Sequence, residues 1–132
     1  KKRELCNQLL DRFGISEIRK TKAGKVSGGE RRRLEIARCL VAEPDIVMLD
    51  EPFSGVDPVT VQSIQDTIQL LRSEGISILI TDHAVREMLE IVDRGYVVSD
   101  GEVLFHGTAD EIWKNREVRE KYLGSMDQRM SA

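Results

Sequence analysis

Two short apolar runs separated by a helical segment limit the fold more than any other feature of the sequence. The first run covers Ile46–Leu49 and the second Ile76–Thr81. The first run is continuous, which is typical of a parallel strand covered on both faces, and the second, interrupted by Ser77, has the composition of a buried strand. Between the runs, Asp57 and Pro58 are typical of a helix start, and Gly75 of a helix end. The order strand, helix, strand predicts an α/β fold with a parallel sheet and right-handed crossovers.

The clearest helix start lies ahead of the first apolar run. Ser27 and Glu30 are spaced as a capping box, in which each side chain accepts a hydrogen bond from the other residue's backbone amide. The apolar residues that follow are expected to pack along one face: Leu34, Ala37, Leu40 and Val41. Cys39 on this helix is predicted to be a core residue. Pro44 is expected to end the helix, because the residue before a proline is pushed out of the helical region.

A shorter helix is expected at the start of the chain. It runs to about Phe13, where Gly14 breaks it. The stretch 19–25 that follows carries four cations and predicts an exposed connection rather than a strand. The chain starts at Lys1, inside this helix, and is therefore interpreted as part of a longer protein.

The C-terminal part is expected to hold a hairpin and short helices. Asp100 and Gly101 form a two-residue turn that accepts positive φ, which favours an antiparallel hairpin at the edge of the sheet. Gly124 is expected to end the last helix, and the tail beyond it to be disordered. The predicted elements are a helix over 83–92, strands over 96–99 and 102–106, and short helices from the capping box of Thr108 and Glu111 onward.

Composition excludes several classes of protein. The 132 residues, 40% hydrophobic and 33% charged, fit one ordinary globular domain. The longest apolar run has four residues, whereas a membrane helix needs roughly 20. A net charge of -3, from 20 basic and 23 acidic residues, gives no general attraction to nucleic acid or anionic lipid, so neither nucleic-acid binding nor direct membrane insertion is expected. Two cysteines make no disulfide framework, and a reducing cytoplasm is the expected compartment.

The helix start at Ser27 has the features of an anion-binding site. Free backbone amides and the positive end of the helix dipole favour an anion there, and Gly28 and Gly29 allow a phosphate to approach the backbone. A plain capped helix would have the same sequence, so both interpretations stay open for the segment Val26–Glu30 alone. The arginines that follow, Arg31–Arg33, point three different ways around the helix and are expected to form a solvated face.

Two adjacent carboxylates, Asp50 and Glu51, follow the first strand, at the edge where ligands bind in open α/β sheets. Because adjacent strand residues point opposite ways, one can hold Mg²⁺ while the other faces a reacting water. His83 follows the second strand and is expected on the same rim, where it could donate to a phosphate. Each also has an ordinary interpretation, as a solvated acidic loop or a surface histidine, and Asp57 is fully explained as an N-cap.

Together, the order and spacing of these segments resemble the ATP-binding cassette (ABC) ATPase family over nearly the whole chain. The matching segments are the signature motif at Val26–Glu30, the Walker B strand at Ile46–Asp50, the catalytic glutamate at Glu51, the D-loop at Ser54–Asp57 and the switch histidine at His83. Val26 replaces the usual leucine and Glu30 the usual glutamine. The resemblance implies the C-terminal part of a P-loop, RecA-like ATPase domain, with a parallel sheet, flanking helices and a C-terminal hairpin.

One family motif is missing. No Gly-x-x-x-x-Gly-Lys-[Ser/Thr] phosphate loop occurs, since at Gly24-Lys25 the first glycine is replaced by Arg19 and the hydroxyl by Val26. By resemblance, the half of the domain with this loop, including a strand between the second apolar run and the hairpin, lies outside the chain, which alone would be inactive. The chain then divides into the end of the helical subdomain with the signature helix (1–44), the core from Walker B through the switch histidine to the hairpin (45–108), and C-terminal helices with a tail (109–132).

The resemblance also implies roles in a head-to-tail homodimer with two composite ATP sites. Asp50 would anchor Mg²⁺, Glu51 would polarise the attacking water and His83 would stabilise the γ-phosphate of the ATP bound to the same chain. The signature residues Ser27, Gly28, Gly29 and Glu30 would face the ATP bound to the partner chain, with Ser27 and Gly29 reaching its γ-phosphate. Asp57 would link the two sites across the dimer.

Within the family, the segments 28–38 and 81–87 are most similar to the ATPases of lipopolysaccharide export. We therefore expect an ATP-hydrolysing subunit that powers this export, peripheral on the cytoplasmic face of the inner membrane and bound to integral membrane transporter subunits. ATPases of branched-chain amino acid importers share other segments and are the alternative. A DNA-repair ATPase is a further alternative, although the sequence has no heptad run for the coiled coils usual in that class.

Overall fold

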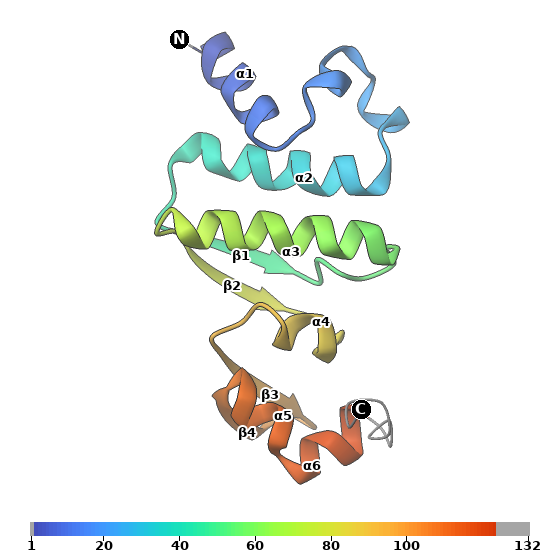
Figure 1. The fold of residues 1–132 in the computed structure, drawn as a ribbon, viewed down its shortest axis with the longest axis vertical. Helices are drawn as coiled ribbons and strands as arrows, with labels where there is room; N and C mark the ends of the chain where they lie inside the picture. Colours follow the sequence, from blue (N-terminus) through green and yellow to red (C-terminus); the bar gives the residue numbers. More distant parts are fainter. Residues whose placement is uncertain (1, 124–132) are drawn as a thin grey trace, which may run out of the picture. The chain divides into compact units, whose positions relative to one another are not determined.

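The computed structural model describes residues 2–123, which form two compact units, 2–82 and 83–123 (Figure 1). The first unit contains, in chain order, α1 (Lys2–Arg12), η1 (Ser16–Lys20), η2 (Ala23–Lys25), α2 (Gly28–Cys39), η3 (Leu40–Ala42), β1 (Ile46–Asp50), α3 (Pro58–Ser73) and β2 (Ser77–Thr81). The second contains α4 (Val85–Leu89), β3 (Arg94–Ser99), β4 (Glu102–Thr108), α5 (Ala109–Lys114), α6 (Arg116–Val118) and η4 (Arg119–Leu123). None of these helices is long and apolar enough to cross a membrane.

The first unit has the predicted α/β order. Strands β1 and β2 pair in parallel, in a register that runs from Ile46 opposite Ser77 to Asp50 opposite Thr81. Helix α3 connects them, with Asp57 as N-cap, Pro58 in its first turn and Gly75 just past its end at φ +85°. Only glycine takes such a φ without strain, so this residue lets the chain leave the helix and enter β2. The prediction of a parallel sheet with a crossover helix is confirmed.

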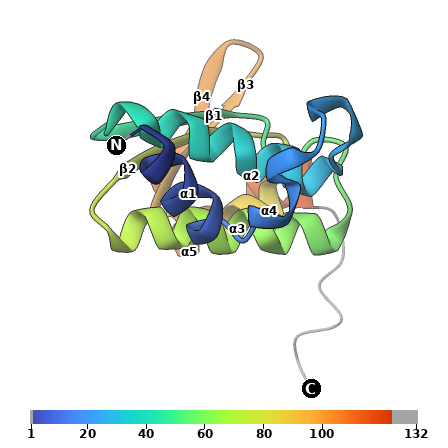
Figure 2. The same ribbon diagram turned by 90° about the horizontal axis from the view of Figure 1, so that it is seen from above.

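The core of the first unit lies between its helices and one face of β1. In Figure 2, α1 lies over the pair formed by α2 and α3. Phe13 and Ile15, at the break after α1, are buried, and Gly14 between them has φ +60°. The cluster joins residues from all three helices and the strand: Leu9, Leu10, Phe13, Ile15, Ile36, Ala37, Leu40, Val47 and Leu71. Burying these apolar side chains is the main force that holds the unit together.

Two predictions for α2 are wrong. Cys39 is exposed rather than part of the core, and Val41 is 56% exposed. Helix α2 ends at Cys39, ahead of Pro44, and the tighter η3 follows. The buried residues Ile36, Ala37 and Leu40 span about 100° of the helix circumference, and Cys39 lies roughly another 100° around from the centre of that face. The packed face is therefore narrower than the spacing of apolar residues indicates.

Strand β1 also differs from its prediction. It was expected to be covered on both faces, and Val47 on one face is indeed only 2% exposed. On the other face, Ile46 is 55% and Met48 71% exposed, and Leu79 of the neighbouring β2 is 49% exposed. Alternate strand residues point to opposite faces, and the helices of the unit cover one face only. The described residues thus leave an apolar sheet face without a layer on it.

The second unit is built around the predicted hairpin. Strands β3 and β4 are antiparallel, and Asp100 (φ +53°) and Gly101 (φ +82°) form the turn. Its buried apolar residues lie after α4 and on α5, α6 and η4: Ile91, Ile112, Val118 and Leu123. Thr108 and Glu111 form the predicted capping box, whereas α4 is shorter than the helix predicted over 83–92. Among the described strands, β3 and β4 pair only with each other, so they do not extend the parallel sheet. The predictions for Gly124 and the tail fall outside the described residues.

Candidate functional site

The predicted site residues of the first unit gather at one end of it. Helices α2 and α3 run side by side with their first turns at the same end as the carboxyl end of β1, as both views show (Figures 1 and 2). Two close approaches fix this arrangement. Arg32 of α2 donates to the backbone carbonyl of Glu51, and Gly29 of α2 lies against Thr60 of α3. We call this end of the first unit the carboxyl-end site.

The start of α2 forms the predicted capping box. The backbone amide of Ser27 donates to the Glu30 carboxylate at 2.7 Å, and the amide of Glu30 donates to Ser27 Oγ at 3.3 Å. The bond from the Ser27 amide, then the Ser27 hydroxyl, hold the pKa of Glu30 below its ordinary value, and the nearby Arg33 lowers it further. The cap occupies two of the four amides that a helix start leaves without helical partners, and those of Gly28 and Gly29 remain available to an anion.

Asp57 caps α3 at the same end. Its carboxylate accepts hydrogen bonds from the Thr60 amide at 3.0 Å and from the Thr60 hydroxyl at 2.6 Å. The hydroxyl bond, then the amide bond, lower the pKa of Asp57, so the side chain is held in its ionised form. The structural role predicted for Asp57 is therefore confirmed, and the cap turns its carboxylate toward the helix.

Asp50 ends β1 and is paired with the end of β2. The Thr81 hydroxyl donates to Asp50 Oδ1, and the two residues are partners in the strand register. Among residues 2–123, no group of three or more His, Cys, Asp or Glu side chains could hold a metal ion by itself. Mg²⁺ usually takes one or two protein carboxylates and completes its shell with phosphate and water oxygens. Asp50, exposed at the end of the sheet, fits a magnesium ion of that kind.

Glu51 lies just outside the strand. Its φ is +46°, and its amide donates to the carbonyl of Thr81 at 2.7 Å. Strand alternation predicts that the side chains of Asp50 and Glu51 point in opposite directions. However, β1 ends at Asp50, so the alternation does not extend to Glu51. The direction of the Glu51 side chain is therefore set by its left-handed backbone and by the contacts of its peptide groups. Its side chain is exposed at the carboxyl-end site.

The three arginines that follow Glu30 are not simply a solvated face. Arg31 is exposed, whereas Arg32 forms an ion pair with Glu35 at 3.0 Å. Arg33 donates from Nη1 to the carbonyl of Phe13 at 3.4 Å, which joins α2 to the end of α1. The prediction that the three point different ways is confirmed, but only Arg31 fits the solvated role.

Three further residues that were not predicted as site residues contact the site: Thr81, Arg32 and Asp82. Asp82 accepts from the Phe53 amide at 2.8 Å and so ties the loop after β1 to the end of β2. Thr81 could have been found, because equal strand lengths place it opposite Asp50. Arg32 and Asp82 have no comparable signal, since their partners are backbone groups 19 and 29 residues away.

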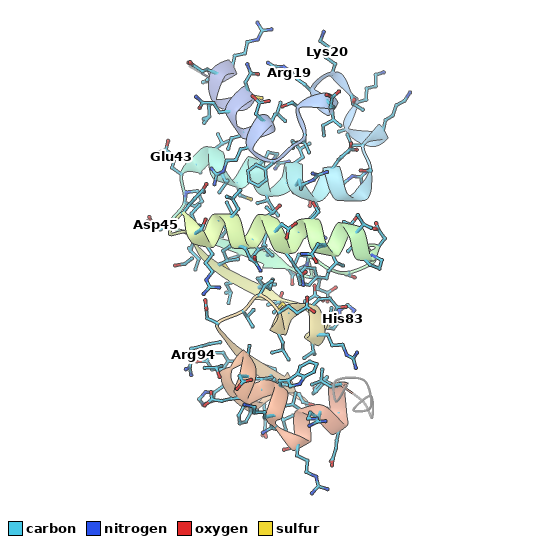
Figure 3. All side chains as sticks on the ribbon, in the orientation of Figure 1. Arg19, Lys20, Glu43, Asp45, His83 and Arg94 are labelled. Carbon is cyan, nitrogen blue, oxygen red and sulfur yellow. The ribbon has the colours of Figure 1, made fainter. Side chains whose placement is uncertain are left out.

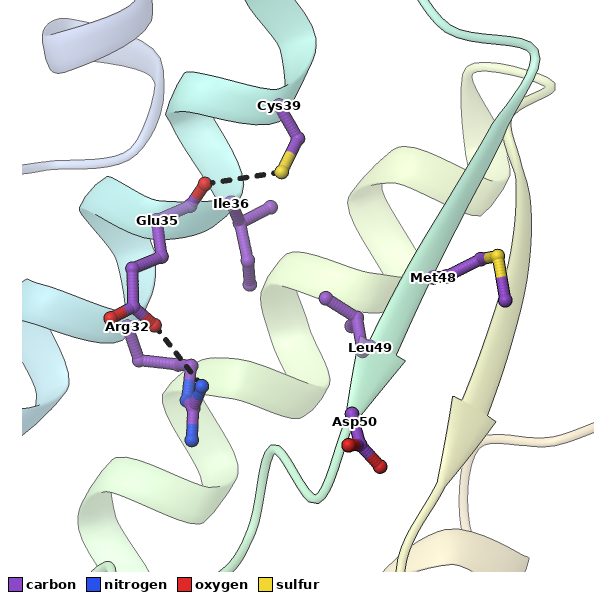
Figure 4. Close-up of a pocket in the computed structure, with 7 residues that line it drawn as sticks. All are labelled: Arg32, Glu35, Ile36, Cys39, Met48, Leu49 and Asp50. Carbon is purple, nitrogen blue, oxygen red and sulfur yellow. Dashed lines mark hydrogen bonds and ion pairs between the residues drawn. The ribbon is translucent and has the colours of Figure 1, made fainter.

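A pocket of about 160 Å³ lies beside β1, between that strand and α2 (Figure 4). The Cys39 side chain forms part of the wall of this pocket. Its thiol donates to the Glu35 carbonyl at 3.4 Å. The lining residues are Arg32, Glu35, Ile36, Cys39, Met48, Leu49 and Asp50. The pocket therefore extends from the uncovered sheet face to the carboxyl-end site.

The structure also places His83, Arg19 and Lys20, which lie on other segments of the chain. His83, labelled in Figure 3, begins the second unit and is exposed just ahead of α4. Its predicted position beside Asp50 and Glu51, which belong to the first unit, stays a prediction. Arg19 and Lys20 lie on the connection between α1 and α2, where the structure has 3-10 turns and no strand, as predicted (Figure 3).

Comparison with known proteins identifies the family of this chain. The sequence pattern described as "ABC transporter" matches residues 1–54. An ABC transporter ATP-binding protein of Rhizobium meliloti is 54% identical over 118 residues, which are 89% of this chain and 44% of the relative. The chain belongs to the ABC transporter family.

A second relative of this ABC chain is LptB of Escherichia coli, the lipopolysaccharide export system ATP-binding protein. It is 48% identical over 119 residues, which are 90% of the ABC chain and 49% of LptB. The ABC chain thus spans about half the length of the curated relatives it matches.

Solved structures with a similar fold also come from ABC transporters. The ADP conformation of an ATP-binding cassette of an ABC transporter matches with a TM-score of 0.83 and 30% identity, over 92% of this chain and 49% of the other. The structure of cbiO1 from Clostridium perfringens, part of the ABC transporter complex cbiONQ, matches with a TM-score of 0.78 and 31% identity, over 90% of this chain and 48% of the other. The predicted fold, the C-terminal part of an ABC ATPase domain, is confirmed.

Proposed function

We propose that the chain is the C-terminal half of the ATP-hydrolysing domain of an ABC transporter subunit. The observation that carries this proposal is the carboxyl-end site, where the strand-end carboxylates Asp50 and Glu51 share one end of the first unit with the start of α2. ATP hydrolysis needs both a metal-holding carboxylate and a group that orients water. The phosphate loop that would bind the nucleotide in the same domain is not among the 132 residues.

The reaction depends on positioning and electrostatics more than on covalent chemistry with the protein. In the complete domain, Asp50 would hold Mg²⁺, which would supply positive charge to neutralise the phosphates. Glu51 orients the attacking water through its carboxylate and accepts a proton from it. His83 donates a hydrogen bond to the γ-phosphate and stabilises the negative charge there.

The start of α2 contributes to the ATP site of the second copy of the chain. In a head-to-tail homodimer, the amides of Gly28 and Gly29 and the hydroxyl of Ser27 face the γ-phosphate of the partner's ATP, while Glu30 holds the cap in shape. Asp57, which caps α3 at the same end, links the two sites. The two glycine amides support this role of α2, because they are available to a phosphate. The capping box uses the amides of Ser27 and Glu30, on either side of them.

For the transported substrate we propose lipopolysaccharide, exported with integral membrane subunits to which this subunit binds from the cytoplasmic face of the inner membrane. The 48% identity to LptB over 90% of the chain supports this. The test is to produce the complete subunit in Escherichia coli cells depleted of LptB and to measure lipopolysaccharide at the cell surface. Restored export supports the proposal. If the subunit is stable and hydrolyses ATP but does not restore export, lipopolysaccharide is not its substrate. That result favours an importer such as the branched-chain amino acid transporters.

A further inference from the structure

The backbone at Glu51 is held in a conformation that its own sequence disfavours. Its φ of +46° lies in the left-handed region, which costs most L-residues steric strain. The next residue is Pro52, and a residue before proline is driven toward extended conformations. A conformation of this kind persists only where surrounding contacts hold it.

Hydrogen bonds to the neighbouring strand, within the loop and from α2 hold the peptide groups of Glu51. Its amide donates to the carbonyl of Thr81 at 2.7 Å, which continues the β1–β2 ladder by one residue. Its carbonyl accepts from the Ser54 amide at 3.2 Å, within the loop, and from Arg32 Nη2, on α2, at 3.4 Å. The bonds with Thr81 and Ser54 join backbone groups and do not depend on the side chain at position 51, whereas the bond from α2 requires a long donor side chain at position 32.

Arg32 is itself held in place. Its Nη1 contacts the Glu35 carboxylate at 3.0 Å, one turn further along α2, and its side chain is 29% exposed (Figure 4). A guanidinium group has several donors in a fixed plane, so one side chain can satisfy both partners at once. The ion pair with Glu35 therefore orients the second nitrogen toward Glu51.

We propose that Arg32 is a positioning residue, which fixes the backbone of Glu51 and thereby the direction of its carboxylate. The inference rests on the proposed function, because it assigns Arg32 a task in the hydrolysis that Glu51 carries out. Without the guanidinium, the bond that ties the Glu51 carbonyl to α2 is lost, the turn bond from Ser54 remains, and φ can relax toward the extended region. The carboxylate, attached to the same Cα, then turns away from the attacking water.

The test compares Arg32→Ala and Arg32→Lys with Arg31→Ala in the complete subunit. Arg31 is the matched control, since it is the neighbouring arginine and is exposed. We expect Arg32→Ala to lower kcat roughly 10- to 100-fold, with a KM for ATP that stays within about twofold of wild type. Arg32→Lys, which keeps a cation on a long stem, should recover part of the rate, and Arg31→Ala should match wild type. A raised KM for ATP with an unchanged kcat in Arg32→Ala would overturn the proposal. Equal rates for Arg31→Ala and Arg32→Ala would also overturn it.

A second readout needs no activity. Hydrogen exchange at the Glu51 amide, measured on the nucleotide-free complete subunit, reports whether its bond to Thr81 still holds. We expect exchange at Glu51 to accelerate in Arg32→Ala and Arg32→Lys but not in Arg31→Ala, with the other amides of β1 unchanged. If the wild-type subunit does not hydrolyse ATP, the proposed function fails, and this exchange experiment still decides whether Arg32 holds Glu51. Unchanged exchange at Glu51 in both Arg32 variants would overturn that positioning role.

Discussion

Gly29 in the first turn of α2 lies directly against Thr60 in the first turn of α3. A β-carbon at Gly29 would be 3.1 Å from Thr60 Oγ1 and 3.3 Å from its Cγ2, whereas one at Gly28 would meet nothing within 4 Å. Thr60 cannot easily give way, because Asp57 binds both its amide and its hydroxyl. The starts of the two helices are thus packed together through one glycine and one threonine.

This contact predicts different effects for two adjacent glycines. Gly29→Ala should lower the free energy of unfolding by about 1–3 kcal/mol, because the new methyl group must displace a fixed side chain. Gly28→Ala should be neutral or stabilising by up to about 1 kcal/mol, since alanine is the better helix former. Chemical denaturation of the complete subunit measures both. Thr60→Ser, which removes Cγ2, should recover part of the loss in Gly29→Ala, and equal effects of the two glycine variants would contradict the contact.

The proposed role of Glu51 predicts an enzyme that binds ATP without turning it over. Glu51→Gln keeps the shape of the side chain but removes the charge that orients water, so hydrolysis should fall at least about 100-fold. Binding of ATP should remain, and ATP should hold the subunit as a dimer. Hydrolysis and ATP-dependent dimerisation are measured on the same sample. Turnover at the wild-type rate would remove Glu51 from the catalytic role.

The capping boxes predict a loss of stability in acid. The pKa of Glu30 is lowered first by the amide of Ser27, and that of Glu111 first by the amide of Thr108. A carboxylate whose pKa is lower in the folded state stabilises the fold above its ordinary pKa, and that contribution is lost as the pH falls from the ordinary pKa through the lowered one. Glu30→Gln and Glu111→Gln should therefore have lower melting temperatures at pH 7 and a smaller further decrease toward pH 3 than wild type. Melting curves that shift in parallel with wild type at all pH values would contradict this assignment.

The uncovered sheet face predicts how the 132-residue chain behaves alone. Without a phosphate loop it should show no binding of MgATP in a calorimetric titration, while the complete subunit binds. Ile46 and Met48 leave an apolar face exposed, and among the described strands β2 pairs only with β1, so the chain should self-associate. Met48→Lys should reduce this association. Micromolar ATP binding by the chain alone would contradict the proposed division of the site.

Local sequence signals predicted the elements and the capped helix starts well, whereas α2 and α4 are shorter than predicted. The caps at Ser27, Asp57 and Thr108 and the Asp100-Gly101 turn depend on neighbouring residues, and each is present in the structure. These features need only a short stretch of chain, because a cap or a tight turn forms from side chains and amides within three or four residues.

Long-range features could not be predicted in the same way. The exposure of Met48 depends on which layers cover the sheet, and the reach of Arg32 to Glu51 depends on how α2 docks beside β1. Cys39 was predicted to be buried from its residue type, but the direction in which the helix presents it decided otherwise. The left-handed backbone of Glu51, next to a proline, runs against local preference and is set by contacts with β2 and α2.

The composite ATP site is the central claim, and mixed dimers test it most directly. A Ser27→Arg chain and a Glu51→Gln chain, isolated together through two different tags, should form one intact site, because the intact Glu51 of the first chain faces the intact Ser27 of the second. A wild-type chain paired with a chain carrying both substitutions should form none. We predict ATP hydrolysis by the first mixed dimer and almost none by the second. The reverse result, with activity in the second and none in the first, would contradict the account, because Ser27 and Glu51 would then act on the same chain's ATP.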